Sequence, residues 1–241
     1  MAERGVRAVG LLSEGLDRLG YLPAPGQVDQ LGRYIAEIEL WNPRLKLVAA
    51  AGRELVVRHV LDSLAGIGPV IDALGTGDAG AGSAPLSVAD LGSGAGFPGI
   101  PIAIMHPECR VDLVERSGRR AGFLRNAVAA TRLANAAVRE TGLEAYEEPV
   151  TLAVYRALHP LSATLYAALL RISGPGGLVC AYKGKRESVE AEVQAVRRGS
   201  GASVEAGIVP VEVPFLSEAR HFLLFGGGLG KVSSTLQVRP V

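Results

Sequence analysis

A glycine-rich turn after an apolar run is the feature that most constrains how this chain can fold. The segment from Ser87 to Gly99 reads SVADLGSGAGFPG, and its glycines are Gly92, Gly94, Gly96 and Gly99. Glycine permits positive φ and lets the backbone approach a ligand closely, while the first turn of a following helix presents free N–H groups. The segment therefore predicts a strand, a ligand-binding turn and a helix, which form the first unit of an α/β sheet.

A second acidic residue, Glu115, follows the turn at the position expected in a nucleoside-binding site. Glu115 follows Asp90 by 25 residues and lies at the expected end of the next strand. A carboxylate in that position accepts hydrogen bonds from both hydroxyls of a ribose. The turn and Glu115 together indicate a site for a cofactor that contains a nucleoside.

Two classes of cofactor compete for this turn. The last three glycines match the G-x-G-x-x-G fingerprint of dinucleotide-binding oxidoreductases. Asp90 with the first three glycines matches the frame acid-x-Gly-x-Gly-x-Gly, in which the acid faces the methionine part of S-adenosylmethionine. This second frame is favoured because Gly92 follows the strand directly, and because Pro98 and Pro101 remove N–H groups that a pyrophosphate would need. A turn that binds no nucleotide remains a third alternative.

The chain divides into three parts by composition. Its 241 residues, 48% of them hydrophobic, suffice for one α/β domain with an accessory element. Residues 1–74 are predicted to form an N-terminal helical cap. Residues 75–85 read GTGDAGAGSAP, which predicts a flexible connection. Residues 86–241 are predicted to form the main domain.

Two helices are predicted in the cap. Apolar residues recur every three or four positions from Leu31 to Trp41 and again from Leu55 to Leu64. We expect Pro43 to end the first helix and the second to end near Gly66.

Seven short apolar runs alternate with amphipathic stretches in the main domain, a pattern typical of a mostly parallel sheet covered on both faces by helices. The last two runs are close together in sequence and are expected to pair antiparallel. The predicted strands are Ser87 to Leu91, Arg110 to Glu115, Ala136 to Arg139, Leu152 to Tyr155, Gly177 to Tyr182, Val204 to Val213 and His221 to Phe225.

Composition excludes several classes of protein. The net charge of +1 indicates no polyanion partner by itself. The two cysteines, Cys109 and Cys180, lie in no zinc or disulfide pattern, so we expect buried, inert thiols and no metal site. No apolar run is long enough for a membrane helix, and the first residues lack the apolar core of a signal peptide, which favours a soluble cytoplasmic protein.

An ordered set of short motifs from about Tyr34 to Phe225 resembles a known family, the bacterial 16S ribosomal RNA guanine-N7 methyltransferases called RsmG or GidB. The pieces that carry the resemblance are Trp41-Asn42, Arg58-His-Val-Leu-Asp62-Ser-Leu, Asp90-Leu-Gly-Ser-Gly-Ala-Gly-Phe-Pro-Gly-Ile-Pro, Gly118-Arg-Arg, Phe123-Leu-Arg, Arg156-Ala157, Lys183-Gly184 and Arg220-His221.

The resemblance implies a Rossmann-like class I methyltransferase domain behind a helical cap. It implies contacts to S-adenosylmethionine from Gly92, Phe97, Leu143, Glu144 and Arg156, to which the turn itself adds Gly94 and Glu115. The implied partner is small-subunit ribosomal RNA or its assembling particle, and we expect a monomer.

Departures from the family pattern affect RNA positioning more than cofactor binding. They are Leu45-Lys46-Leu47 after the Trp-Asn pair, Thr151 in place of an Asp, Tyr155 in place of a small residue, and Gly142 in place of an Arg.

The residues after the fourth predicted strand narrow the methyl acceptor. Tyr155 to Pro160 contain neither the Asn/Asp-Pro-Pro-aromatic turn used for exocyclic amines nor the cysteine needed for C5 of a pyrimidine. Guanine N7 has a free lone pair, so its methylation requires alignment and no general base. Arg156 is the expected catalytic residue, stabilising charge or holding a phosphate nearby. Another RNA, a protein or a small molecule remains an alternative acceptor, and an NAD-binding oxidoreductase is the more distant alternative.

A basic stretch without acids supports an RNA partner. Between Arg116 and Arg139 the chain has six arginines and no Asp or Glu, and several of them are expected to share one helix face as a phosphate-binding strip. The alternative is a solvated face neutralised by acids from elsewhere. For His59 and Asp62 we expect packing or capping, and for Trp41 a core contact.

Overall fold

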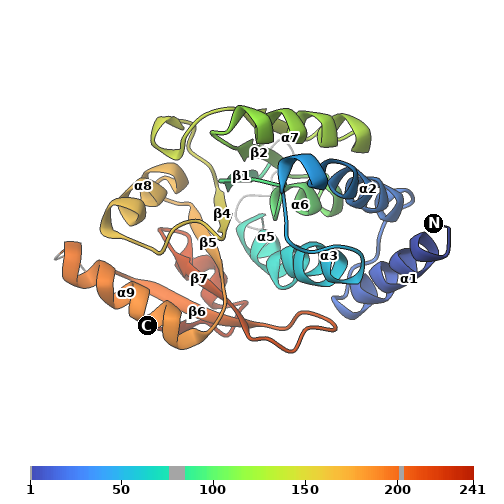
Figure 1. Cartoon of the computed structure of the whole chain (residues 1–241). Helices are drawn as coiled ribbons and strands as arrows, with labels where there is room; N and C mark the ends of the chain where they lie inside the picture. The colour runs from blue at the N-terminus through green and yellow to red at the C-terminus, as the bar shows by residue number, and fades with distance from the viewer. Residues whose placement is uncertain (1, 76–84, 201–203) are drawn as a thin grey trace.

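The computed structural model describes residues 2–75, 85–200 and 204–241, and an eight-stranded sheet lies at the centre of this part of the chain (Figure 1). The strand order is β3-β2-β1-β4-β5-β7-β6-β8. The strands are β1 (Ser87–Leu91), β2 (Arg110–Val114), β3 (Ala136–Arg139), β4 (Leu152–Arg156), β5 (Leu178–Lys183), β6 (Ala206–Val211), β7 (Arg220–Phe225) and β8 (Arg239–Pro240).

The sheet is parallel from β3 to β5 and antiparallel beyond it. β7 pairs antiparallel with both β5 and β6, and β8 pairs antiparallel with β6. All seven predicted strands are present with bounds within two residues, and the predicted antiparallel pair at the end is confirmed. The predicted number of strands is wrong, because β8 adds an eighth. A two-residue strand that contains Pro240 is too short to show the alternation by which strands are recognised.

Helices connect the strands and form the N-terminal part. They are α1 (Ala2–Arg18), α2 (Gln27–Leu45), α3 (Arg53–Leu55), the π-helical segment η1 (Val56–Leu61), α4 (Asp62–Leu64), α5 (Ile67–Gly75), α6 (Gly99–Met105), α7 (Gly118–Thr131), the 3-10 turn η2 (Leu143–Ala145), α8 (Ala163–Ser173), α9 (Arg186–Ser200) and α10 (Leu229–Ser233).

Both predicted cap helices exist, but the first ends later than expected. Pro43 lies inside α2, which continues to Leu45. One missing N–H costs little so near the end of a helix, where Lys46 takes the left-handed conformation and donates its backbone N–H to the carbonyl of Asn42. The second helix runs from α3 through η1 to α4 and ends before Gly66, as predicted, although the π geometry of η1 was not expected.

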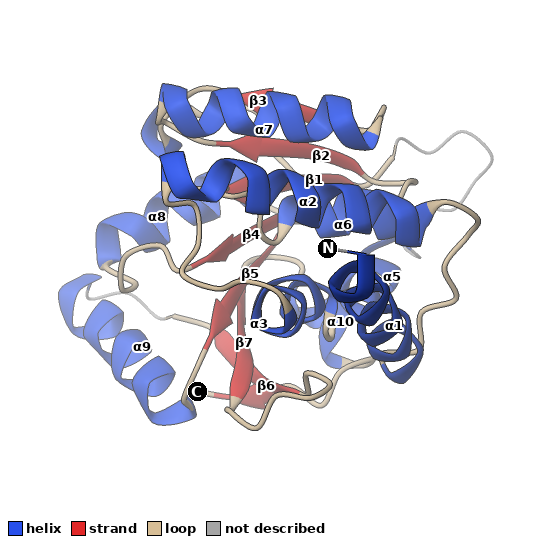
Figure 2. Ribbon diagram, turned by 45° about the vertical axis from the view of Figure 1, so that its right-hand side comes forward, coloured by secondary structure: helices blue, strands red, loops and turns tan. Residues whose placement is uncertain are grey.

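Two apolar layers cover the two faces of the sheet. Figures 1 and 2 show α8 and α9 on one side, whereas α2, α5, α6 and α7 lie on the other. On the first face, α8 and α9 pack on residues such as Ala153 and Val179. On the opposite face, the N-terminal helices share one core with Val154 and Leu178. The cap is thus packed directly on the sheet face beside the glycine turn.

The predicted connection 75–85 lies mostly outside the described residues, since only its two ends are described. Among the helices that are described, none combines the length and apolar character needed to cross a membrane.

Candidate functional site

The glycine turn lies at the carboxyl edge of the sheet, directly after β1. Gly92, Gly94 and Gly96 have φ of 73°, 60° and 95°, conformations that favour glycine. Space is also restricted. A Cβ on Gly96 would come within 2.9 Å of the Tyr34 hydroxyl, and one on Gly92 within 2.8 Å of a methyl group of Leu158. The turn is therefore specified both by backbone geometry and by close packing.

Asp90 is fully buried beneath the turn and has one oxygen without a partner. Its Oδ2 accepts hydrogen bonds from Ser93 Oγ (2.6 Å) and from the backbone N–H of Gly99 (3.0 Å). Within the described chain its Oδ1 has none. Burial raises the pKa of Asp90 to about 6, although the bonds from Ser93 and Gly99 favour the carboxylate. A buried acceptor of this kind fits the ammonium group of S-adenosylmethionine, which would supply the missing donor.

Glu115 follows β2 and is hydrogen-bonded to the glycine turn. The carboxylate is buried, with Oε2 accepting from the N–H of Gly94 (2.9 Å) and Oε1 from the N–H of Ser117 (2.8 Å). Each carboxylate oxygen has a second lone pair, so both remain able to accept a ribose hydroxyl. The structure therefore brings Gly94 and Glu115 together in a geometry compatible with the expected ribose site.

Phe97 connects the far end of the turn to the cap. Its ring is buried and lies 5.2 Å from the ring of Tyr34 and 5.0 Å from that of His59, between centroids. The Tyr34 hydroxyl donates to the carbonyl of Ala95 (2.7 Å). Because Tyr34 is on α2 and His59 on η1, two cap helices hold the residues that follow the glycines.

Arg156 is the last residue of β4, one residue beyond the predicted end of that strand, and its guanidinium stacks over Phe97 with Cζ 5.0 Å from the ring centre. Nη1 donates to Asp62 Oδ2 (3.1 Å) and to the carbonyl of Arg58 (3.2 Å), and Nη2 donates to His59 Nδ1 (2.7 Å). The Arg156 side chain is 16% exposed. The expected catalytic arginine is thus half-buried between the turn and the cap.

A second arginine shares the same carboxylate. Arg220 at the start of β7 donates its Nε to Asp62 Oδ1 (2.9 Å). Asp62 is buried, so two guanidinium groups and one carboxylate lie together at the junction of cap and sheet. Their charges sum to one positive charge, which suits a site that receives a polar or anionic substrate.

Leu143 and Glu144 lie further along the edge, on η2 after β3. Leu143 is half-buried and Glu144 is exposed. Their backbone carbonyls accept from Arg171 Nη2 at 3.3 and 3.4 Å. Their position after the third strand agrees with the sequence, while the hydrogen bonds of their carbonyls come from Arg171 of α8.

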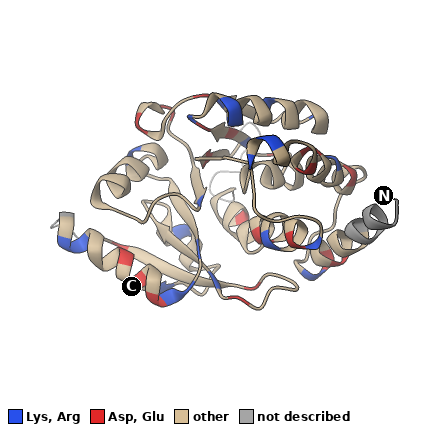
Figure 3. Cartoon of the chain, viewed as in Figure 1, with Lys and Arg blue, Asp and Glu red and all other residues tan. Residues whose placement is uncertain are grey.

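The six arginines of the basic stretch fall into two groups. Arg125 pairs with Glu140 (2.6 Å), and Arg139 pairs with Asp112 (3.3 Å) and Glu148 (3.4 Å). The other four are exposed and make no ion pair within the described chain; they are Arg116, Arg119, Arg120 and Arg132. Figure 3 shows basic positions along α7, whereas α9 carries both signs of charge. Neutralisation by acids from elsewhere therefore holds for Arg125 and Arg139, and phosphate binding stays a prediction for the other four.

Three of the four unpaired arginines lie near the site. Arg116 follows the carboxyl end of β2, and Arg119 and Arg120 lie in the first turn of α7. Because α7 runs back from this edge, Arg132 at its end lies toward the opposite edge of the sheet.

Sequence reasoning missed the contacts of His59 and Asp62 with Arg156. Packing or capping was expected for both, and His59 does pack on Phe97, but both also bond to Arg156. A signal was present, because His59 and Asp62 flank the apolar pair Val60 and Leu61 on the expected helix, and polar groups held in such a core require partners. The cysteines are buried as expected, and burial raises the thiol pKa of Cys109 to about 12. In the described ranges no cluster of His, Cys, Asp and Glu has the arrangement of a metal site.

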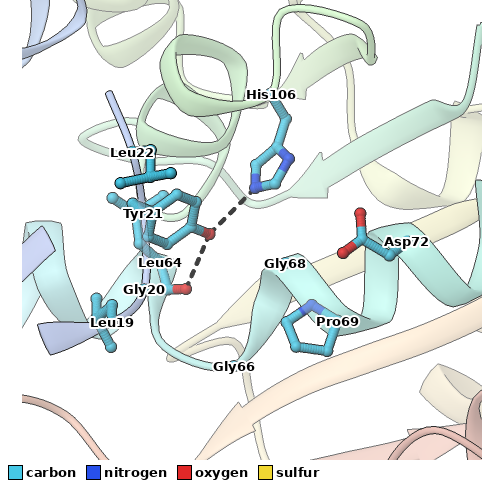
Figure 4. Close-up of a pocket in the computed structure, with 10 residues that line it drawn as sticks. All are labelled: Leu19, Gly20, Tyr21, Leu22, Leu64, Gly66, Gly68, Pro69, Asp72 and His106. Carbon is cyan, nitrogen blue, oxygen red and sulfur yellow. Dashed lines mark hydrogen bonds between the residues drawn. The ribbon is translucent and has the colours of Figure 1, made fainter. Parts of the chain in front are cut away.

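A separate cavity of about 400 Å³ lies at the other edge of the sheet, beside the end of α6 (Figure 4). The Tyr21 hydroxyl lies 3.2 Å from the carbonyl of Leu64 and 3.1 Å from His106 Nε2, and Asp72 also lines the cavity. None of the predicted cofactor residues contributes to it.

Comparison with known proteins gives a consistent result. A family model described as GidB, rRNA small subunit methyltransferase G, matches residues 27–222. A protein named ribosomal RNA small subunit methyltransferase G from Treponema pallidum is 36% identical over 222 residues, covering 88% of this chain and 91% of its own. A protein of the same name from Roseiflexus castenholzii is 37% identical, with 78% of each chain covered. Among solved structures, a human methyltransferase 10 domain containing protein superposes with a TM-score of 0.53 at 13% identity, over 82% of this chain and 98% of that one.

Proposed function

Because this chain belongs to the GidB family of rRNA small subunit methyltransferases G, it is an enzyme that transfers a methyl group from S-adenosylmethionine to guanine N7 in 16S rRNA, and we propose how its residues do so. Family membership also decides between the two frames of the glycine turn in favour of S-adenosylmethionine. The oxidoreductase alternative is thereby excluded.

The buried Asp90 beneath the glycine turn is the observation that supports the cofactor position best. Its unpartnered Oδ1 is proposed to accept from the ammonium group of the cofactor, while Glu115 accepts from the ribose hydroxyls. Gly92, Gly94 and Phe97 form the wall against which the cofactor lies. Leu143 and Glu144 are proposed to meet the adenine, one strand further along the edge.

When bound, the cofactor supplies an electrophilic methyl group on a sulfonium. The protein's contribution is then alignment and exclusion of water, because guanine N7 needs no base. Arg156 is proposed to be the catalytic residue. Arginine donates to O6 of guanine or to a phosphate, both of which are acceptors, and its position over Phe97 places those donors beside the glycine turn.

The RNA is proposed to approach over the start of α7. Arg116, Arg119 and Arg120 are exposed, have no ion-pair partner in the described structure and lie at the same edge as Arg156. Such cations bind phosphates without reading sequence. The partner is proposed to be the assembling small subunit or its RNA, met in the cytoplasm by a monomer of this protein. Analytical ultracentrifugation tests the oligomeric state.

Methyl transfer from labelled S-adenosylmethionine to small-subunit RNA, with and without ribosomal proteins, tests the acceptor. N7-methylguanosine carries a fixed positive charge, so the RNA becomes cleavable there after mild reduction and aniline treatment. We expect one strong cleavage site, at a guanine. Label on an exocyclic amine, a ribose oxygen or a pyrimidine carbon would contradict the proposed acceptor while leaving the cofactor site intact.

A further inference from the structure

The Arg156 guanidinium is held by one short stretch of the cap. Its three donor contacts end on the Arg58 carbonyl, His59 Nδ1 and Asp62 Oδ2. A guanidinium carries five N–H donors, so the contacts within the described residues leave two for a ligand. The orientation of Arg156 is therefore set by residues about a hundred positions earlier in the chain.

The π geometry of η1 explains how the Arg58 carbonyl becomes free to take part. In an α-helix the backbone N–H of Asp62 would bond to the carbonyl four residues before it, which is that of Arg58. Here it donates instead to the carbonyls of Val57 and His59, and the Arg58 carbonyl accepts from Arg156. Single π turns of this kind are frequent at functional sites.

His59 can make its contact only as a neutral ring. Arginine has no acceptor, so Nδ1 of His59 must offer its lone pair, which leaves the proton on Nε2. Burial, followed by the charges of Arg156, Arg58 and Arg220, lowers the pKa of His59 to about 4. The ring therefore stays an acceptor throughout the range in which an ordinary histidine becomes a cation.

We propose that Asp62 and His59 are positioning residues of the methyl-transfer site. Asp62 holds Arg156 and Arg220 side by side, one on each carboxylate oxygen, and His59 fixes the plane of Arg156. Arg220 uses one further donor on the Ala219 carbonyl, so in the described part of the chain three of its five donors remain for a ligand beside the two of Arg156. The proposal rests on the proposed function, because the ligand of these donors is the target nucleotide.

Asp62→Asn tests the shared carboxylate. An amide keeps one acceptor oxygen but turns an NH₂ group toward the other guanidinium, so one arginine loses its partner. We expect kcat per folded enzyme to fall at least tenfold. RNA affinity at low salt should be unchanged or tighter, since the local charge rises from one to two positive charges. Asp17→Asn, an equal charge change on the exposed side of α1, is the matched control.

His59→Asn and His59→Leu test whether the hydrogen-bond acceptor at position 59 is needed. The Asn amide oxygen can take the place of Nδ1, whereas Leu retains apolar packing against Phe97 and offers no acceptor. Positioning predicts that Asn keeps more of the kcat than Leu. A purely structural role predicts the reverse order, together with a lower melting temperature for Asn.

Nitrogen NMR of His59 gives a readout that does not depend on activity. At pH 6 we expect a neutral ring protonated on Nε2 alone. The positioning proposal is overturned if the ring is a cation at this pH, if kcat per folded enzyme of Asp62→Asn stays within twofold of Asp17→Asn, or if the total activity and RNA binding of Asp62→Asn fall only in proportion to its folded fraction. Absence of N7 labelling by the unchanged protein would instead reject the proposed function, and the NMR result would still report on His59.

Discussion

Two sets of arginines flank the carboxyl edge of the sheet, and the protein holds them in different ways. Arg156 and Arg220 are half-buried, share the buried Asp62 and make directed hydrogen bonds. Arg119 and Arg120 are exposed at the start of α7 and have no ion-pair partner in the part of the chain that the structure describes.

The difference separates two uses of positive charge. Partial burial of a cation requires directed partners, and those partners fix its geometry. An exposed cation is screened by salt and attracts phosphates with little directional preference. We therefore expect Arg156 and Arg220 to control the rate of methyl transfer, and the buried acids Asp90 and Glu115 to control cofactor affinity. Arg119 and Arg120 should control RNA affinity and its salt dependence.

Arg156→Ala should give the largest effect. Loss of positioned donors at a reacting centre typically costs on the order of 10²–10³ in kcat. Arg156→Lys should restore only part of it, because an ammonium lacks the planar fork that meets Asp62 and His59 together. Single-turnover rates at saturating cofactor and RNA check this. Full rescue by Lys would mean that the charge of Arg156 suffices without its directed hydrogen bonds. The proposed difference between Arg156 and the exposed arginines would then be wrong.

Glu115→Ala should have the next largest effect, on cofactor binding. Hydrogen bonds to a charged group contribute roughly 1.5–3 kcal/mol, so the dissociation constant for S-adenosylmethionine should rise on the order of 10- to 100-fold. Titration calorimetry measures it. Glu115→Gln, which retains one acceptor oxygen, should lose less. Unchanged affinity in both variants would place the ribose elsewhere.

Asp90 predicts a pH dependence of cofactor binding. Its pKa in the free protein is about 6, above the usual value for Asp, so the carboxyl is mostly protonated at pH 5. A cofactor ammonium requires the carboxylate, so binding must release this proton, and affinity should rise roughly tenfold between pH 5 and pH 7 and then level off. Calorimetry in buffers of different ionisation enthalpy measures the number of protons released when the cofactor binds.

The same raised pKa has an opposite effect on stability. Between about pH 4 and 6 the folded state holds the Asp90 proton more tightly than the unfolded state does, so this residue's contribution to the free energy of unfolding decreases as pH rises. Asp90→Asn removes that dependence. Equal pH profiles for Asp90→Asn and the unchanged protein, in both binding and unfolding, would show that Asp90 does not titrate in this range.

Features with local causes were predictable from the sequence. The glycine turn depends on positive φ, which only glycine adopts easily, so Gly92 and Gly94 were recognised from residue type alone. The strands showed as apolar runs between turn residues. Arg156 and Glu115 could be placed because each stands at the end of such a run, and strand ends meet at one edge of a parallel sheet.

Features that depend on distant contacts were not predictable in this way. The π turn in η1 does not change the apolar periodicity. Sequence analysis therefore could not predict that the Arg58 carbonyl is free to accept from Arg156. Asp62 meets Arg156 and Arg220 across 94 and 158 positions of sequence. Likewise, Arg125 is neutralised by Glu140, an acid just outside the acid-free stretch. Only tertiary packing decides which charges in such a stretch remain free.

Reversal of Arg119 and Arg120 to Glu should have the smallest effect and a different character. Each lost phosphate contact should reduce the slope of log affinity against log salt by about 0.7 to 0.9. RNA affinity should weaken several-fold at low salt and less at high salt, while cofactor affinity stays unchanged. Arg132→Glu is the matched control for each single reversal, since Arg132 is also exposed but lies at the far end of α7. If this control weakens RNA binding as much as Arg119→Glu or Arg120→Glu alone, the RNA does not approach over the start of α7, and the exposed arginines act only through the overall charge of the protein.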